Sequence, residues 1–214
     1  MGAADRSREA ADRKYRRRIS EAIAELAHER KLKGAAADDL CRRAAIPRRD
    51  FDRLFPSLQA ALRCAFAEGF DCLFEPVHAA GAAAPSWLEG LASALDALLQ
   101  AAAEHPRLAE LCLSYSLVAP ENSAGHDYRA AVDEVSALVR VARVHAEAEA
   151  RQTSNVPVLA EEFLAHGILS RAGQIAERDG QAAPRGRRGD LLMLVLMTFY
   201  GTADAARMCR EIED

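Results

Sequence analysis

Residues 38–57 read Asp-Asp-Leu-Cys-Arg-Arg-Ala-Ala-Ile-Pro-Arg-Arg-Asp-Phe-Asp-Arg-Leu-Phe-Pro-Ser, and they predict two short helices joined by a tight turn. Leu40 and Ala44 lie four residues apart, which gives the first helix one small apolar face. The second helix has its apolar residues at spacings of three and four, and its other positions are rich in arginine. The apolar residues of this second segment are Ile46, Phe51, Leu54 and Phe55.

Two short helices packed at an angle, with a cationic outer face on the second, are typical of a helix-turn-helix that enters the major groove of DNA. Arg48 and Arg49 fall in the first turn of the second helix, where a guanidinium can bind guanine O6 and N7. Two roles are open for Asp50, because its carboxylate can accept a hydrogen bond from a cytosine amine or pair with a neighbouring arginine. The candidate DNA-binding residues are Arg42, Arg43, Pro47, Arg48, Arg49, Asp50 and Arg53.

Composition favours an all-α chain. Half of the 214 residues are apolar, only 6% are aromatic, and glycine and proline together occupy 20 positions. No alternating strand pattern with a hairpin turn occurs, and alanine is abundant. We therefore expect about nine helices, with a three-helix N-terminal domain followed by a larger C-terminal helical bundle. The expected helices cover about 14–30, the two segments within 38–57, 57–76, 86 onward, 106 onward, 127–150, 155 onward and 190–210, after a polar arm at residues 1–12.

The net charge of −4 is unevenly distributed. Residues 1–62 hold 15 Lys and Arg against 10 Asp and Glu, net +5, whereas residues 63–214 hold 13 against 22, net −9. A basic first part on an acidic body suits a protein that presents one end to a polyanion. Chance is the alternative reading of this modest asymmetry. We accordingly expect two domains, at residues 1–62 and 63–214.

Several features indicate a cytoplasmic protein without a membrane partner. The N-terminus is charged and lacks the apolar core of a signal peptide. The longest apolar run, from Leu191 to Tyr200 and broken only by Thr198, is too short to span a bilayer. Five scattered cysteines form no Cys-x-x-Cys pair, which favours a reducing compartment.

Residues 19–62 resemble the N-terminal DNA-binding domain of TetR-family transcriptional regulators. The helix from Ile19 to Arg30, Ile-Ser-Glu-Ala-Ile-Ala-Glu-Leu-Ala-His-Glu-Arg, is similar to the helix that precedes the motif in this family. The match continues without a gap through Asp38-Asp39-Leu40, Arg43-Ala44, Ile46, Arg48, Phe51, Arg53, Phe55-Pro56-Ser57 and Ala60-Ala61-Leu62.

The resemblance implies a homodimer that binds a palindromic double-stranded DNA operator and acts as a repressor released by a small-molecule effector. It also implies that residues 63–214 form a ligand-binding and dimerisation domain. Effector pockets leave no linear signature, so the candidates below can equally be ordinary core residues. The candidate pocket residues are Trp87, Tyr115, Met193, Met197 and Tyr200. The candidate dimer residues on the last two helices are Phe163, Gly167, Ile168, Leu192, Leu196 and Phe199, for which packing within one subunit is the alternative.

Some positions depart from the family pattern. Asp52 stands where an aromatic residue usually faces phosphate. Leu54 replaces a polar or aromatic residue, and Leu58 replaces a lysine that typically contacts phosphate. Ala45 stands where glycine usually makes the turn, at a cost of about 1 kcal/mol if the backbone there needs a positive φ. These departures keep open an alternative function, a degenerate member that lacks specific DNA binding and acts as a ligand-sensing or protein-interaction module.

Two further groups of residues have more than one possible role. Arg13, Lys14 and Arg16–Arg18 suit phosphates or a minor groove, or form a solvated helix face. Glu25 and His28 have the Glu-x-x-His spacing of di-iron bundles, but such sites need two copies of the motif. No phosphate loop, Ser/His/Asp order or His-Glu-x-x-His motif occurs, so we expect no enzyme, catalytic residue, metal or cofactor.

Overall fold

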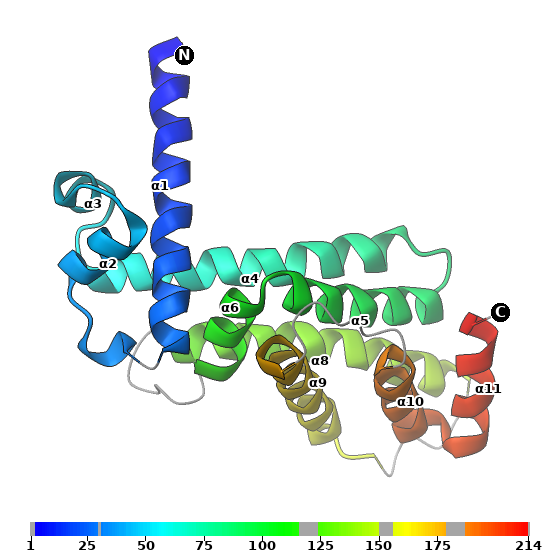
Figure 1. The fold of residues 1–214 in the computed structure, drawn as a ribbon. Coiled ribbons are helices and arrows are strands. Elements are labelled where there is room, and N and C mark those ends of the chain that lie inside the picture. Colours follow the sequence, from blue (N-terminus) through cyan, green and yellow to red (C-terminus); the bar gives the residue numbers. More distant parts are fainter. Residues whose placement is uncertain (1–2, 30, 116–123, 150–155, 179–186, 214) are drawn as a thin grey trace. The chain divides into compact units, whose positions relative to one another are not determined.

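A computed structural model describes residues 3–29, 31–115, 124–149, 156–178 and 187–213 of the chain (Figure 1). These residues form ten α-helices, one 3-10 turn and one π-helical segment, and they contain no strand, which confirms the predicted all-α class. Packing divides the chain into two compact units. We call Met1–Asp71 with Arg107–Asp127 the N-terminal unit, and Cys72–Pro106 with Tyr128–Asp214 the C-terminal unit. The functional division at residue 62 stays a prediction.

The N-terminal unit is built around α1 (Ala3–His28), which packs against α2 (Ala37–Ala44) and against the π-helical segment η2 (Glu110–Tyr115). The 3-10 turn η1 (Leu32–Gly34) joins α1 to α2, and α3 (Arg48–Leu54) packs on α2. The first part of α4 (Leu58–Ala83) and most of α6 (Pro106–Ala109) complete the unit. Its buried core includes Ile19, Ile23, Leu40, Phe51 and Phe66.

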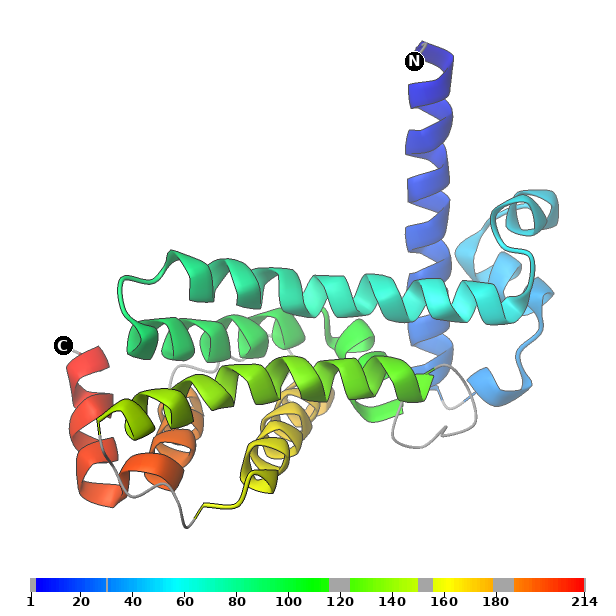
Figure 2. The same ribbon diagram turned by 180° about the vertical axis from the view of Figure 1, so that it is seen from behind.

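α1 begins much earlier than predicted. We expected a frayed arm over residues 1–12, whereas the helix already starts at Ala3 and extends past α3 (Figures 1 and 2). The segment is rich in alanine, the strongest helix former, and contains no Gly or Pro after residue 2. Asp12 also forms an ion pair with Arg53 of α3, which anchors this part of the helix to the unit.

α4 also runs further than predicted, because it passes through Pro76 and ends at Ala83 instead of stopping near the proline. Proline removes one backbone hydrogen bond of the helix, but the neighbouring Phe74 and Val77 are fully buried and hold the segment in place. Beyond it, Ser86 caps α5 (Trp87–Glu104) by accepting a hydrogen bond from the Glu89 amide at 3.2 Å.

α5 is the central helix of the C-terminal unit and packs against α9 (Leu159–Arg178), α10 (Arg187–Tyr200) and α11 (Thr202–Glu213) (Figure 2). α8 (Ala124–Ala148) lies in the same unit from Tyr128 onward. The predicted single last helix is wrong, because Gly201 has φ +78° and separates α10 from α11. Within the described residues, no helix combines the length and apolar character needed to cross a membrane.

Candidate nucleic-acid interface

A closed apolar core fixes α3 against α2. The predicted inner faces are buried, with Leu40 and Ala44 on α2 and Phe51 on α3 each less than 5% exposed. Ile46 and Phe55 flank α3 and are buried as well, and the Phe51 and Phe55 rings lie 5.4 Å apart between centroids at an angle of 45°. Burial of this face leaves the opposite side of α3 to solvent.

The turn between the helices has left-handed backbone at Ala45, with φ 51° and ψ 52°. The Ile46 amide donates to the Cys41 carbonyl at 2.9 Å and the Ala45 amide donates to the Arg42 carbonyl at 3.3 Å. This is the Schellman arrangement that ends a helix and redirects the chain. The positive φ anticipated at this alanine is therefore present. Pro47 caps α3, and its carbonyl accepts from the Asp50 amide at 3.0 Å.

Asp39 organises the start of α2. Its carboxylate accepts from the Ala36 amide at 2.9 Å and from the Arg42 guanidinium at 2.6 Å. These contacts, the backbone hydrogen bond above all, lower the pKa of Asp39 below its ordinary value. Arg42 stays largely exposed at the surface, although its charge is paired.

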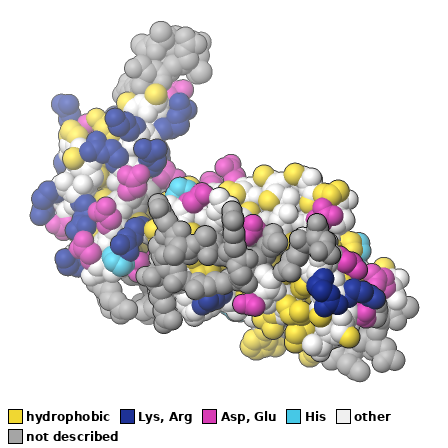
Figure 3. Space-filling model, turned by 45° about the vertical axis from the view of Figure 1, so that its right-hand side comes forward, with side chains coloured by type: hydrophobic (Ala, Val, Ile, Leu, Met, Phe, Trp, Pro, Cys, Tyr) yellow, Lys and Arg dark blue, Asp and Glu magenta, His cyan; other side chains and the backbone are white. Residues whose placement is uncertain are grey.

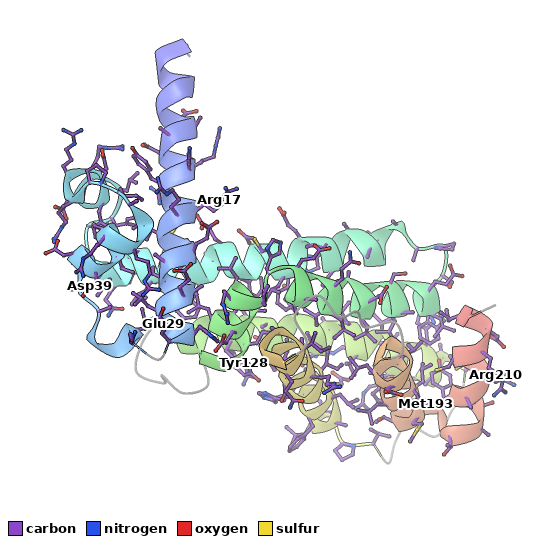
Figure 4. The ribbon with its side chains drawn as sticks, in the orientation of Figure 1. Arg17, Glu29, Asp39, Tyr128, Met193 and Arg210 are labelled. Atoms are coloured by element: carbon purple, nitrogen blue, oxygen red, sulfur yellow. The ribbon has the colours of Figure 1, made fainter. Side chains whose placement is uncertain are left out.

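Arg43 points toward α1 instead of away from the unit. Its guanidinium donates to Glu29 at 2.6 and 3.1 Å and to Glu25 at 3.2 Å. Hydrogen bonds from Arg43 and Lys31 lower the pKa of Glu29 to about 2 and the carboxylates raise the pKa of Arg43. Figure 4 shows Glu29 directly after the end of α1 and Asp39 on α2. Arg43 therefore joins the two helices.

Arg48 is held between two carboxylates. Its Nε donates to Asp52 at 2.9 Å and its Nη1 donates to Asp38 at 2.7 Å. These hydrogen bonds, the one to Asp52 first, raise the pKa of Arg48 above its ordinary value. The unusual carboxylate of Asp52 is thus neutralised within α3 by the residue one turn before it. Sequence reasoning missed Asp38 as the second partner, although both residues belong to the quoted stretch.

Arg53, near the end of α3, is bound by α1. Its guanidinium donates to both carboxylate oxygens of Asp12, at 2.9 and 2.7 Å, and lies 3.6 Å from Asp50. The hydrogen bonds to Asp12 raise the pKa of Arg53. Nothing in the sequence pairs Asp12 with a residue 41 positions later, so only the folded structure reveals this contact.

Arg49 differs from the other four predicted arginines. Its side chain is 87% exposed, and its nearest carboxylate in the described part of the chain is that of Asp50 at 3.8 Å, near the limit for an ion pair. It lies in the first turn of α3, on the solvent side of the apolar core. Figure 3 shows basic and acidic side chains interspersed over the surface of this unit. Arg49 is therefore the cation of the helix-turn-helix best placed to meet a ligand.

No family model matches the sequence, and no curated protein sequence matches it. Among solved structures, the chain is similar to the crystal structure of a TetR-like transcriptional regulator from Rhodococcus sp. RHA1, with a TM-score of 0.61. The alignment covers 87% of this chain and 96% of the other at 14% sequence identity. The chain has a TetR-like fold. The helix-turn-helix described above is thus found within a fold that matches over nearly its whole length.

In the C-terminal part of the TetR-like fold, two of the five predicted pocket residues are in contact. The Trp87 ring stacks on Tyr200 with centroids 6.1 Å apart, and on His145 with centroids 4.5 Å apart. Met193 is half-buried and Met197 is exposed, while the Tyr115 side chain lies outside what the structure describes. Sequence reasoning missed His145, which carries no pattern that points to an aromatic stack.

The predicted dimer residues separate into two groups. Phe163 is 68% exposed, and Gly167 faces open space. The other four are buried within the C-terminal unit itself. Sequence reasoning missed further exposed apolar side chains on α9 and α10 and directly before α9. Figure 3 shows hydrophobic side chains gathered on the lower part of this unit. The four buried residues are Ile168, Leu192, Leu196 and Phe199, and the additional exposed residues are Val158, Leu159 and Leu194.

A buried ion pair supports the start of α9 beside these exposed residues. Arg143 of α8 donates to Glu161 at 2.6 Å and to the carbonyls of Val156 and Pro157 at 3.1 and 2.9 Å. Arg140 adds a second hydrogen bond to Glu161 at 2.8 Å. Residues 156 and 157 directly precede the exposed apolar stretch. The network therefore holds the start of α9 against α8.

The Glu-x-x-His pair does not act as a unit. Glu25 binds Arg43, whereas His28 Nδ1 lies 2.7 Å from the Glu110 carboxylate of η2. The described residues contain no cluster of three or more His, Cys, Asp or Glu side chains with the geometry of a metal site.

Proposed function

We propose that this chain is a DNA-binding transcriptional regulator that reads a palindromic operator as a homodimer. The observation that carries the proposal is the exposed Arg49 in the first turn of α3, held outward by the buried Phe51 side of the same helix. A recognition helix needs this combination, because its first turn reaches base edges while its apolar side anchors it to the domain. The TetR-like fold supports the same assignment.

In this proposal Arg49 binds guanine, because a guanidinium matches the O6 and N7 acceptors in the major groove. Arg48 is tied to Asp38 and Asp52, so it acts first as a brace that joins α2 to α3. Arg42 pairs with Asp39 three residues before it but remains at the surface, so it can approach a phosphate.

The exposed apolar faces of α9 and α10 support a homodimer. Leu159 and Phe163 lie four residues apart on α9, as do Phe163 and Gly167, and Leu194 and Met197 lie three apart on α10. Apolar residues at these spacings form a stripe along each helix, and packing against a second copy would remove them from water. We further propose repression relieved by a small-molecule effector in the C-terminal unit; the Trp87 and Tyr200 stack is the candidate place.

A salt titration tests the DNA-binding function. The wild-type protein and its Arg49→Gln and Arg207→Gln variants are titrated by fluorescence anisotropy with a duplex of random sequence, from about 50 to about 200 mM salt. For a DNA-binding protein, the logarithm of the binding constant falls linearly with the logarithm of the salt concentration. We expect Arg49→Gln to weaken binding. Arg207→Gln, on α11, should have the wild-type affinity. Absence of salt-dependent binding by the wild type refutes the proposal.

A second function is favoured by a specific observation. Four of the five arginines of the helix-turn-helix are paired with carboxylates, and α2 and α3 together hold five arginines and four aspartates, net +1. A nearly neutral recognition surface suits a ligand-sensing or protein-interaction module that has lost specific DNA binding. The same salt titration separates the two functions.

A further inference from the structure

A dense group of basic side chains lies on α1, outside the recognition helix. Residues 13–18 contain Arg13, Lys14, Arg16, Arg17 and Arg18 with no acidic residue, a charge of +5, whereas α2 and α3 together have a net charge of +1. A polyanion responds to this concentration of charge more strongly than to the neutralised arginines of the helix-turn-helix.

One side of this α1 segment is fixed against α3 and α4. Asp12 binds Arg53 of α3, while the Arg16 guanidinium lies 5.2 Å from the centre of the Phe55 ring and 3.8 Å from Cys64 Sγ of α4. These contacts come from two positions four residues apart, so they define one face of the helix. The helix is therefore held in a defined rotation.

Three of the other four basic residues lie on the opposite face. A rotation of about 100° per residue places Lys14, Arg17 and Arg18 about 120–180° from the mean direction of Asp12 and Arg16, and Arg13 about 80° from it, at the edge of this face. Arg13 and Lys14 are exposed, and Figure 4 shows Arg17 on the side of α1 away from α2 and α3.

Their charges are also largely uncompensated. Arg17 pairs with Glu21 at 3.4 Å, at a highly exposed site where solvent screens the interaction. Among the described residues, Arg13, Lys14 and Arg18 form no ion pair. α1 extends past α3 in the same unit (Figures 1 and 2).

We propose that the basic face of α1, formed by Arg13, Lys14, Arg17 and Arg18, is a second DNA surface that binds the phosphate backbone. The inference rests on the proposed DNA-binding function and deepens it, because it assigns affinity to α1 and sequence reading to α3. Contacts to phosphates carry no sequence information, so this face strengthens binding to every duplex equally.

The test compares two triple variants of equal charge. One variant combines Arg13→Gln, Lys14→Gln and Arg18→Gln, and glutamine preserves helix propensity. The matched control makes the same change at three exposed arginines of the C-terminal unit. The control residues are Arg129, Arg207 and Arg210.

Binding is measured against salt with a random duplex and with a duplex selected for tight binding. Each phosphate contact contributes about 0.9 to the logarithmic salt slope, so the α1 variant should have a slope shallower by up to about 2.7. Its preference for the selected duplex should equal that of the wild type, and the control should keep the wild-type slope. An unchanged slope in the α1 variant, or a changed preference, overturns the inference while leaving the proposed function intact. Absence of duplex binding by the wild type overturns the proposed function itself.

Discussion

Replacement of Ala45 by glycine should stabilise the protein, because the turn between α2 and α3 holds this alanine at φ 51° and ψ 52°. An L residue in this left-handed conformation costs about 1–2 kcal/mol, since its Cβ crowds the following carbonyl. Glycine removes that strain but gives the unfolded chain more freedom, which costs about 0.4–1 kcal/mol. The expected net gain is about 0.5–1 kcal/mol, or about 1–4 °C in the thermal midpoint for a chain of this length.

Circular dichroism thermal scans of Ala45→Gly and Ala35→Gly provide the assay and its control. Ala35 is also in a loop beside α2, but its φ is −70°, so glycine there only increases the freedom of the unfolded chain and should lower the midpoint. Opposite shifts in the two variants support the strained turn. A decrease of similar size in both variants would refute the reasoning, because Ala45 would then not be under strain.

Three other changes test the remaining interactions. Removal of Arg143 by R143A should cost about 3 kcal/mol, because its partner Glu161 is 5% exposed and keeps only Arg140; the thermal midpoint should fall by about 6–12 °C. Glu29 has its pKa lowered from 4.5 to about 2, so its pairing with Arg43 stabilises the fold above the ordinary pKa and is lost as the pH falls toward 2. When the pH is lowered from 6 to 3, the thermal midpoint of Glu29→Gln should therefore fall less than that of the wild type. An equal fall in both proteins would contradict the pairing. F163E should give a monomer in analytical ultracentrifugation with little change in midpoint, and an intact dimer would exclude this exposed residue from the interface.

The sequence predicts the helix-turn-helix well because its determinants are local. The spacing of Leu40, Ala44, Phe51 and Phe55 follows from helical periodicity within 16 residues, and all four side chains are buried. The Ser86 cap of α5 is likewise a property of four consecutive residues. Such features are determined by residues that lie close together in the sequence, within one or two helical turns.

The pairing of the arginines depends on distant contacts, so the sequence could not provide it. Arg53 meets Asp12 only because α1 includes residue 12 and brings it beside α3, and Arg43 meets Glu29 only because α2 packs against α1. The acidic partners of both arginines are distant along the chain, so the sequence alone does not indicate either pairing.

The helix boundaries that differ from the prediction have a similar explanation. α4 continues through Pro76 because tertiary burial of Phe74 outweighs the lost hydrogen bond, whereas the break at Gly201 depends on a positive φ that glycine permits but does not dictate.

The central claim is that α3 presents Arg49 to DNA from each subunit of a dimer. Selection of bound duplexes from a random pool, carried out in parallel with the wild type and with Arg49→Ala, tests it most directly. We expect the wild type to recover a two-fold symmetric sequence with half-sites about 10 base pairs apart or a multiple of that, and the variant to lose a guanine at equivalent positions of both halves. Recovery of no common sequence by the wild type, or of the same sequence by both proteins, would contradict the claim.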